Sequence, residues 1–284
     1  MARNRIPKDQ NGGLIYDFYT EAAKESLPGH LTDDMYGAID NITKFDGWVQ
    51  CGPAGKTGYA LPDWSGDDDV LDVVSTSAND AEYGTGAERV RMFGIAQEGK
   101  REVEQVDLNG TTPVTTNSPF TFLNFVGVRS DRIDNQNSSN IGTITISRNS
   151  DGGILSVIPP FTGRNADGRR IVQVGESLIP RKLTISTSTD AGLEVQLQKY
   201  RLDEVGNLDI WINIWGGFVT RGIASFDLEA TGSYQGLSNV YRIMVRSTSP
   251  LPTSVRAHMS FIKVATECIT PRVIGFGIDY PNAV

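Results

Sequence analysis

Apolar and polar residues alternate in short segments through most of the chain. Val90 and Met92 alternate with arginines, and in the segment 193–198 leucine and valine alternate with Glu and Gln. Alternation with a period of two is the pattern of a β-strand that buries one face. These segments are separated by clusters of Gly, Asn, Asp, Ser and Pro, which form tight turns. The pattern therefore predicts an all-β chain.

A first β domain is predicted for residues 46–150. Its clearest feature is a strand in which Val106 and Leu108 share one face and which ends at Asn109-Gly110, a pair suited to a two-residue type I′ hairpin turn. Pro113 in the returning strand lacks a backbone N–H, which favours a position at a sheet edge. The other strands predicted for this domain cover 70–74, 88–95, 120–128 and 140–147.

A second β domain is predicted for residues 151–270, followed by a C-terminal tail, 271–284. The segment 209–215 is apolar on both faces, with isoleucines in one register and Trp211 and Trp215 in the other. Such a strand is expected between two sheets or in a contact between subunits. The strands predicted for this domain cover 154–158, 171–174, 183–186, 193–201, 208–215, 218–228, 240–246 and 254–264.

Residues 1–45 differ from the rest and are predicted to form an N-terminal arm. The segment 17–27 has the pattern of a short helix that ends at Pro28-Gly29, and a second short helix is predicted for Thr32 to Ile42. Such an arm packs on the body of the protein or on a neighbouring subunit; the alternative is a frayed terminus. The predicted fold class is thus all-β: two β-sandwich, jelly-roll-like domains preceded by an extended N-terminal arm with short helices.

The charge balance narrows the choice of partners. The 284 residues contain 26 Lys+Arg against 34 Asp+Glu, a formal net charge of -8. Because affinity for nucleic acid depends on basic residues that neutralise phosphates, we expect no nucleic-acid partner. No apolar run approaches the roughly 18–20 residues that span a bilayer, and no apolar stretch follows the basic N-terminus, so we expect neither a membrane partner nor a signal peptide.

Few residues are suited to catalysis. The chain has two cysteines, Cys51 and Cys268, and two histidines, His30 and His258. This is too little for a disulfide scaffold or a histidine-based metal site. Nothing in the sequence places a histidine beside Cys51, which is expected to be a buried thiol. We therefore predict a non-enzymatic protein with no catalytic residue, no cofactor and no metal.

Three motifs resemble ligand-binding sequences, but each has a simpler interpretation. The run 52–57 has a Gly-Lys-Thr ending but two residues too few for a phosphate-binding loop, and Pro53 removes a donor. Gly84-Thr-Gly86 lacks the third glycine of a dinucleotide fingerprint and is expected to be a turn that leads into a strand. The run 67–69 with Asp72 could supply oxygen ligands to calcium, but its spacing is not that of an EF-hand loop, which favours an acidic turn.

Aromatic residues provide the candidate contact sites. The tryptophans Trp48, Trp64, Trp211 and Trp215 can stack on sugars or partners, although packing in a core or between subunits is the more frequent use of such rings. Phe18 and Tyr19 stand on the first predicted helix of the arm. We identify Phe18, Tyr19, Trp211 and Trp215 as candidate interface residues.

Residues 70–150 resemble a β module of virion structural proteins from tailed bacteriophages, notably marine and cyanobacterial ones. The resemblance rests on three features: Gly84-Thr-Gly86 leading into 89–94, the hairpin sequence 104–116, and the strands 122–128 and 140–147. Residues 151–265 match only in general pattern, since the family has a Val-Pro-x-Gly-Lys type strand entry where this chain has 174–182. The resemblance implies a component of the virus particle and no chemistry.

These observations lead to a virion structural protein assembled in the host bacterial cytoplasm. Its partners would be itself, as a homo-oligomer for which closed symmetric assemblies suggest a trimer, and major capsid or tail proteins. The first hypothesis is an accessory protein on the capsid surface, that is, a cement or decoration protein. The alternative is a tail, neck or baseplate component. A receptor- or glycan-binding module that uses Trp64 or Trp211 is a further alternative. A hydrolase that uses the 67–69 carboxylates comes last.

Overall fold

The computed structural model describes residues 30–60, 69–96, 101–129, 139–172, 176–188, 192–201, 210–220, 222–228, 234–235 and 240–265. All regular structure in these ranges is β-strand, which confirms the predicted all-β class. The strands are β1 (His30–Ile42), β2 (Val49–Gln50), β3 (Leu71–Ser75), β4 (Arg89–Ile95), β5 (Arg101–Asp107), β6 (Val114–Thr115), β7 (Phe122–Arg129), β8 (Ile144–Arg148), β9 (Ile154–Ile158), β10 (Arg169–Ile171), β11 (Glu176–Thr187), β12 (Leu193–Arg201), β13 (Ile210–Val219), β14 (Ile223–Asp227), β15 (Tyr234–Gln235), β16 (Val240–Ser247) and β17 (Thr253–Ala265).

The larger body is a jelly roll. One sheet has the order β1-β17-β11-β14, with β15 beside β11, and the other has the order β10-β16-β12-β13, with β2 beside β16. The strands β3 to β9 belong to the other body. When the short strands β2 and β15 are also left out, eight strands of this body remain. When these eight strands are numbered from 1 to 8 in chain order, the first sheet has the order 1-8-3-6 and the second has the order 2-7-4-5. This is the strand order of an eight-stranded, double-sheet jelly roll.

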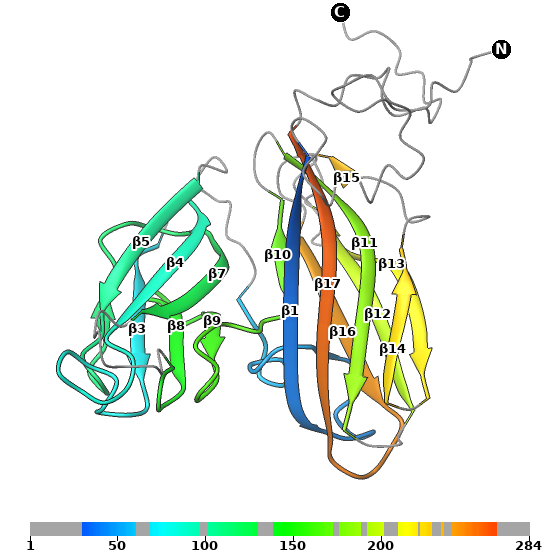
Figure 1. Cartoon of the computed structure of the whole chain (residues 1–284), viewed down its shortest axis with the longest axis horizontal. Coiled ribbons are helices and arrows are strands. Elements are labelled where there is room, and N and C mark those ends of the chain that lie inside the picture. Colours follow the sequence, from blue (N-terminus) through cyan, green and yellow to red (C-terminus); the bar gives the residue numbers. More distant parts are fainter. Residues whose placement is uncertain are drawn as a thin grey trace, which may run out of the picture.

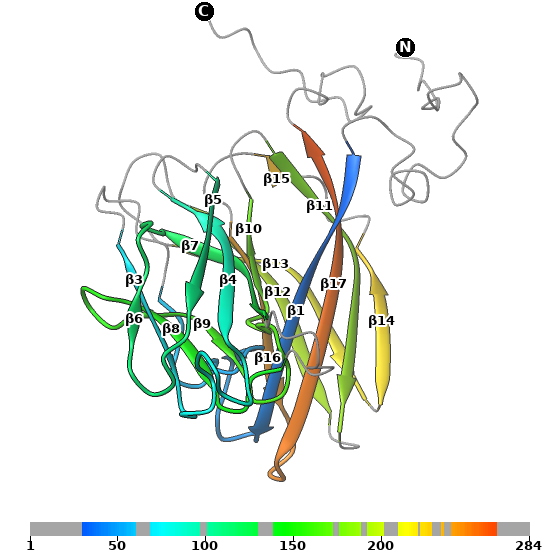
Figure 2. The ribbon, with the colours of Figure 1, turned by 60° about the vertical axis from the view of Figure 1, so that its left-hand side comes forward.

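The smaller body is a second sandwich, inserted between β1 and β10 of the jelly roll. Its sheets have the orders β6-β3-β8-β9 and β5-β4-β7. Figures 1 and 2 show it beside the jelly roll, on the side of β1 and β10. The strand pairing divides the chain differently from the predicted boundaries at 45/46 and 150/151, because β1 and β2 pair within the jelly roll and β9 pairs with β8.

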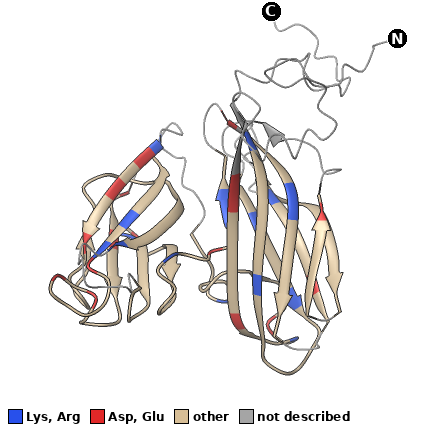
Figure 3. Ribbon diagram, viewed as in Figure 1, with Lys and Arg blue, Asp and Glu red and all other residues tan. Residues whose placement is uncertain are grey.

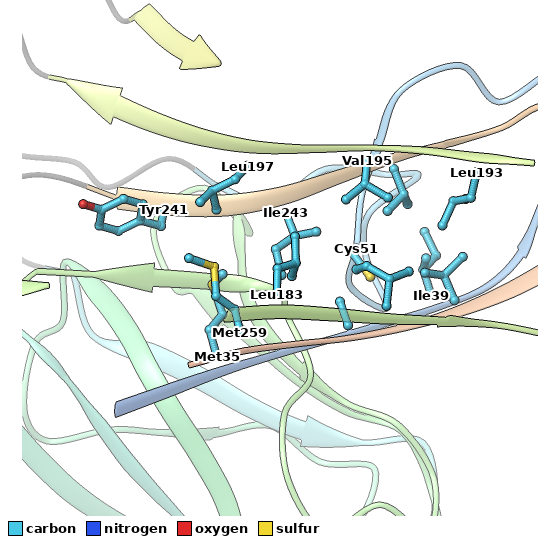
Figure 4. Packing of buried hydrophobic residues seen from close by; sticks show 14 of the residues in the cluster. Met35, Ile39, Cys51, Leu183, Leu193, Val195, Leu197, Tyr241, Ile243 and Met259 are labelled. Carbon is cyan, nitrogen blue, oxygen red and sulfur yellow. The ribbon is translucent and has the colours of Figure 1, made fainter. Parts of the chain in front are cut away.

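Each sandwich has its own apolar core. Inward positions follow the alternation in the sequence: Val90 and Met92 of β4 are buried in the inserted sandwich, and Leu193, Val195 and Leu197 of β12 are buried in the jelly roll. Figure 4 shows the jelly-roll core between its two sheets, with side chains from β1, β11, β12, β16 and β17 pointing toward one another. The burial of these apolar side chains is the main contribution to the stability of both bodies.

The helix predicted for Thr32 to Ile42 is wrong, because this segment is part of strand β1. Met35, Ile39 and Ile42 have the spacing of a helix face, but Met35 and Ile39 also fit one face of a strand. The segment pairs antiparallel with β17 from His30↔Val264 to Ile42↔Thr253, with a bulge after Ile39. This long-range pairing with β17 makes the segment a strand. The helix predicted for 17–27 lies outside the described residues.

The predicted hairpin is wrong, because the strands on either side of Asn109-Gly110, β5 and β6, lie in different sheets, and the tight turn between them lies one residue later than predicted. Thr112 N–H donates to the carbonyl of Asn109 at 3.1 Å, so Gly110 and Thr111 are the corner residues. Gly110 has a φ of +58°, whereas Asn109 is not among the residues with positive φ. The turn thus has the φ pattern of type II′ and not of type I′. The edge position predicted from Pro113 is confirmed, since β6 is the edge strand of its sheet.

A buried carboxylate joins the two bodies where the chain returns to the jelly roll. Asp167 is only 2% exposed, and its side chain accepts hydrogen bonds from the hydroxyls of Tyr59 (2.9 Å) and Ser156, the amide of Asn165 (2.7 Å) and the backbone N–H of Val157 (3.2 Å). Tyr59 precedes the inserted sandwich, and Ser156 and Val157 belong to its last strand, β9. One carboxylate therefore fixes the entry and the exit of the insertion.

Arg169 lies next to this carboxylate and is also buried. Its guanidinium donates to the carbonyls of Ala60 (2.9 Å) and Leu155, and it stacks on the rings of Tyr59 and Phe122 at 4.5 and 4.6 Å. Burial lowers the pKa of Arg169, and the negative charge of Asp167 opposes that shift. The pair therefore supplies a charged link within an otherwise desolvated junction.

We predict that Asp167→Ala strongly destabilises the protein. The hydroxyls of Tyr59 and Ser156 and the N–H of Val157 would lose their acceptor in a buried site, and Arg169 would lose its neighbouring charge. The free energy of unfolding should fall by about 3–5 kcal/mol. Urea denaturation followed by tryptophan fluorescence measures this change.

Asp107→Ala is the matched control, because Asp107 is solvent-exposed and forms a surface ion pair with Arg89 at 2.6 Å. Its loss should cost less than about 1 kcal/mol. Equal denaturation midpoints for Asp167→Ala and Asp107→Ala would contradict the role assigned to Asp167.

Candidate functional site

The lateral edge of the jelly roll is formed by β13 and β14. In the described part of the chain, β13 pairs only with β12 and β14 only with β11. Among the described residues, each strand therefore has one row of backbone N–H and C=O groups without a strand partner, and such an edge can pair with another chain. Figure 1 shows these strands on the side of the jelly roll away from the inserted sandwich.

Three apolar side chains of these two strands are exposed. Phe218 stands on the outer face of one sheet, opposite Glu194, and Ile223 stands on the outer face of the other, opposite Ser186. Ile212 and Phe218 of β13 are 43% and 50% exposed, and Ile223 of β14 is 75% exposed. A free strand edge combined with exposed apolar side chains is suited to burial against another protein. We call β13, β14 and these side chains the lateral edge.

Trp215 is packed within the molecule. Its ring lies 4.8 Å from the ring of Phe226 and contacts the jelly-roll core. A Cβ atom on Gly217 would come within 2.3 Å of the indole, so the ring needs a glycine at that position. The β12–β13 register shifts between Leu197 and Gln198, which breaks the strict alternation predicted for 209–215. The described residues 211–215 of that segment lie in a half-exposed edge strand and are not buried between two sheets.

Trp211 ends a row of side chains across the outer face of one sheet. The row runs from Ile171 through Val240 and Tyr200 to Trp211, each paired with the next across neighbouring strands. Trp211 contacts Tyr200 at 5.1 Å, and the guanidinium of Arg242 lies 3.5 Å from the centre of its ring. Burial lowers the pKa of Arg242 to about 10. Trp211 thus has partners within the chain, and its role in a subunit contact stays a prediction.

The other aromatic candidates are divided between described and undescribed parts of the chain. Phe18, Tyr19 and Trp64 lie outside the described residues. Trp48 is partly buried, and the guanidinium of Arg246 lies 5.0 Å from the centre of its ring. The structure does not bring the described candidates into one patch, since Trp215 faces the core and Trp211 the outer face of the sheet.

Cys51 is a buried thiol, as predicted. It lies in the jelly-roll core (Figure 4), and burial raises its pKa to about 12. His258 lies on the opposite face of β17 from the core residues Ala257 and Met259. Its Nε2 atom is 2.9 Å from a carboxylate oxygen of Asp34, and its ring stacks on Tyr36. Cys51 and His258 therefore do not form a nucleophile–base pair; Cys268 and the side chain of His30 lie outside the described part.

The glycine-rich motifs are closed turns. In 52–57, Gly55 N–H donates to Gly52 and Thr57 N–H donates to Ala54, and Lys56 contacts Asp46 at 3.0 Å. Gly84 and Gly86 form the turn before β4 that was predicted, with N–H bonds to Ala81 and Asn79.

Asp69, the described member of the acidic run, also has a structural partner. Its carboxylate accepts hydrogen bonds from the backbone N–H and the hydroxyl of Ser150. Asp72 likewise accepts from the hydroxyl of Thr115 at 2.7 Å and from the amide of Asn149 at 2.9 Å. The two carboxylates thus stabilise neighbouring turns and strands, and the other two aspartates of the run are not described.

A search of the described ranges finds no group of three or more His, Cys, Asp or Glu side chains that could hold a metal ion. Over the same ranges, no helix is long and apolar enough to cross a membrane. What the described surface offers is the lateral edge, which sequence reasoning missed in part. The sequence pointed to the segment 209–215 but not to Phe218 or Ile223.

Comparisons with known proteins give only faint similarity. No family model and no curated protein matches the chain. Solved structures with some likeness are the T13 particle of infectious bursal disease virus (11% identity, 87% of this chain and 74% of that chain, TM-score 0.23) and the Gt strain of the same virus (9% identity, 91% and 80%, TM-score 0.21). A VP2 subviral particle of this virus is similar at 9% identity, 86% and 74% coverage and a TM-score of 0.21. These TM-scores are too low to bear on fold or function.

Proposed function

We propose that this chain is a non-enzymatic structural protein of a virion, which acts through contacts with its own copies and with other proteins of the particle. The jelly roll supports the proposal, because double-sheet jelly rolls are common in viral capsid proteins; they also occur in lectins and cupins. Since a fold alone does not determine function, the choice rests on the surfaces that the fold presents.

The lateral edge is the observation that carries the proposal. The interior of the jelly roll is filled by apolar side chains of the described residues, so its outer surfaces are what it offers to partners. At the lateral edge, strand edges without a partner among the described residues are flanked by exposed Ile212, by Phe218 on one outer face and by Ile223 on the other. A second copy that added a strand or packed its own edge there would satisfy the backbone groups and bury the side chains.

Packing of the lateral edge against a different surface of the next copy would build a closed ring, whereas edge-to-edge packing of the same surface would give a two-fold dimer. Homo-oligomers usually close through point-group symmetry, and we propose three copies. The N-terminal arm with Phe18 and Tyr19, and the rings Trp211 and Trp215, are proposed to contribute to contacts with neighbouring copies or with the particle.

Within this class we propose an accessory protein of a tailed bacteriophage, a cement or decoration protein bound to the major capsid protein on the head. The resemblance of residues 70–150 to phage virion modules supports this source. A component of the tail, neck or baseplate is the alternative, and a host receptor- or glycan-binding module is a further one.

Acidic substitutions at the lateral edge should weaken self-association. We expect Ile223→Asp and Ile212→Asp each to weaken it at least tenfold, because a charge would be desolvated in the contact, while the exposed positions leave unfolding within about 0.5 kcal/mol of the parent chain. Sedimentation velocity over a range of concentrations measures the association, and urea denaturation checks the fold.

Leu251→Asp is the matched control, since Leu251 is also an exposed apolar residue of the jelly roll but lies in the turn between β16 and β17. It should associate like the parent chain. A parent chain that stays monomeric at all concentrations, or a Leu251→Asp variant as impaired as Ile223→Asp, would rule out the lateral edge as the self-contact.

The location of the chain in the particle distinguishes the capsid decoration proposal from the tail, neck or baseplate alternative. Immunogold labelling of intact source particles should place gold over the heads, and quantitative mass spectrometry should find hundreds of copies per particle, if the chain decorates the capsid. About a dozen copies with gold on the tail or one vertex would favour the tail-machine alternative. Absence of the chain from purified particles would overturn the virion proposal.

A further inference from the structure

A cavity of about 470 Å³ opens on the inserted sandwich, and three arginines line it. Arg91 and Arg129 come from β4 and β7, and Arg164 comes from the loop that leads back to the jelly roll. Two phenylalanine rings, Phe125 and Phe161, stand among them. The described lining is completed by Gly127, Val128, Ser139, Thr162 and Gly163, so it contains no carboxylate. Figure 3 shows basic positions on β4 and at the start of β5 of this sheet.

Two of these arginines contact aromatic rings, whereas five other arginines of the described chain pair with carboxylates. Arg89, Arg148, Arg170, Arg246 and Arg256 each form an ion pair with a carboxylate. By contrast, the described contacts of Arg91 and Arg164 are with aromatic rings: Arg91 lies 4.7 Å from the centre of Phe93, and Arg164 lies 4.2 Å from the centre of Tyr36. A guanidinium over an aromatic ring has no acceptor in that ring's plane, and its N–H donors can bind an oxyanion that lies in the guanidinium plane.

Phe161 marks the rim of this cavity with a strained backbone. Its φ is +60°, which a bulky side chain rarely adopts, and its ring is 71% exposed. The strain is held by the buried Asn140, whose carbonyl accepts the N–H of Phe161 and whose side chain binds Pro159 and Gly163. Strained backbone conformations of this kind cluster at functional sites, ligand clamps among them.

We propose that this cavity binds one unit of an acidic saccharide, through a carboxylate or sulfate group. Guanidinium forks match the geometry of such oxyanions and bind them by paired hydrogen bonds. The cavity is much larger than a single oxyanion, and its size is in the range of small-ligand sites. The faces of Phe125 and Phe161 offer apolar area against which a sugar ring packs.

The surroundings favour a short acidic unit over an extended polyanion. An adjoining cavity of about 490 Å³ between the two sandwiches shares Arg129 and Arg164 with the first. It carries the carboxylates of Asp33, Asp34 and Asp167 beside further basic residues, of which Arg170 pairs with Asp33 and Lys263 with Glu176. A single-stranded nucleic acid needs a basic groove that follows its backbone. Here the arginines converge at one point beside these carboxylates, on a chain of net charge -8.

Calorimetric titration of the full chain tests this proposal, which does not depend on the proposed virion role. The probes are a galacturonate trimer, its methyl-esterified neutral form, a trimer of sulfated galactose, sodium sulfate and a short single-stranded oligonucleotide. We expect at least one acidic trimer to bind and the neutral form not to bind. Arg164→Gln should weaken that binding at least tenfold.

Phe161→Gly separates recognition from folding. Glycine accepts positive φ without strain, so this variant should unfold no more readily than the parent chain while it binds the acidic trimer less tightly. Lys182→Gln is the matched charge control, because Lys182 is an exposed cation of β11 in the jelly roll, and its binding should equal that of the parent.

Three results would overturn the proposal. Sulfate binding as tightly as the acidic trimers would show an adventitious ion only. An oligonucleotide that binds more tightly than the sugars, with the same loss in Arg164→Gln, would assign the cavity to nucleic acid. If neither acidic trimer binds the parent chain, acidic saccharides are ruled out as ligands of this cavity.

Discussion

The architecture depends on the hydrogen bonds that converge on Asp167. The jelly roll contains an insertion of about a hundred residues between its first two strands, and without a fixed junction the inserted sandwich would sample many orientations. A buried carboxylate that accepts from Tyr59, Ser156, Asn165 and the backbone of Val157 joins both ends of the insertion. Satisfying so many donors inside a desolvated junction favours one geometry of the two bodies.

This junction also determines which surfaces stay free. It holds the inserted sandwich against the β1 and β10 side, so the lateral edge on β13 and β14 faces away from it (Figure 1). The same junction brings Arg164, which follows the last inserted strand, beside Arg91 and Arg129. The two bodies thus divide the work in our account: the jelly roll provides the contacts of assembly and the inserted sandwich provides a site for a small anionic ligand.

Sequence alternation predicted most strands because one face of each is buried. The strands 154–158 and 193–201 were placed at their observed bounds, and the inward sides of β4 and β12 followed directly. The secondary-structure predictions that are wrong concern segments whose conformation depends on partners far away in the chain. Residues 32–42 carry a helix-like spacing and became a strand only because β17 lies alongside, more than 200 residues later.

The sites were harder to predict than the strands. Arg91, Arg129 and Arg164 stand on separate elements, and their meeting follows from the topology and not from any local motif. Ile223 looked like an ordinary strand residue, and its exposure results from β14 lying at the end of its sheet. The tryptophans, prominent in the sequence, were the natural candidates for contacts, yet Trp215 packs on Phe226 and Trp211 on Tyr200.

The central claim is that the lateral edge is buried when the protein assembles. Amide hydrogen exchange, followed by mass spectrometry, compares the free, dilute chain with the same chain in purified particles. The account predicts that peptides covering 210–219 and 222–228 exchange more slowly in particles, because their free N–H groups become hydrogen-bonded. Equal exchange of these peptides in both states, with protection gained elsewhere on the chain, would contradict it.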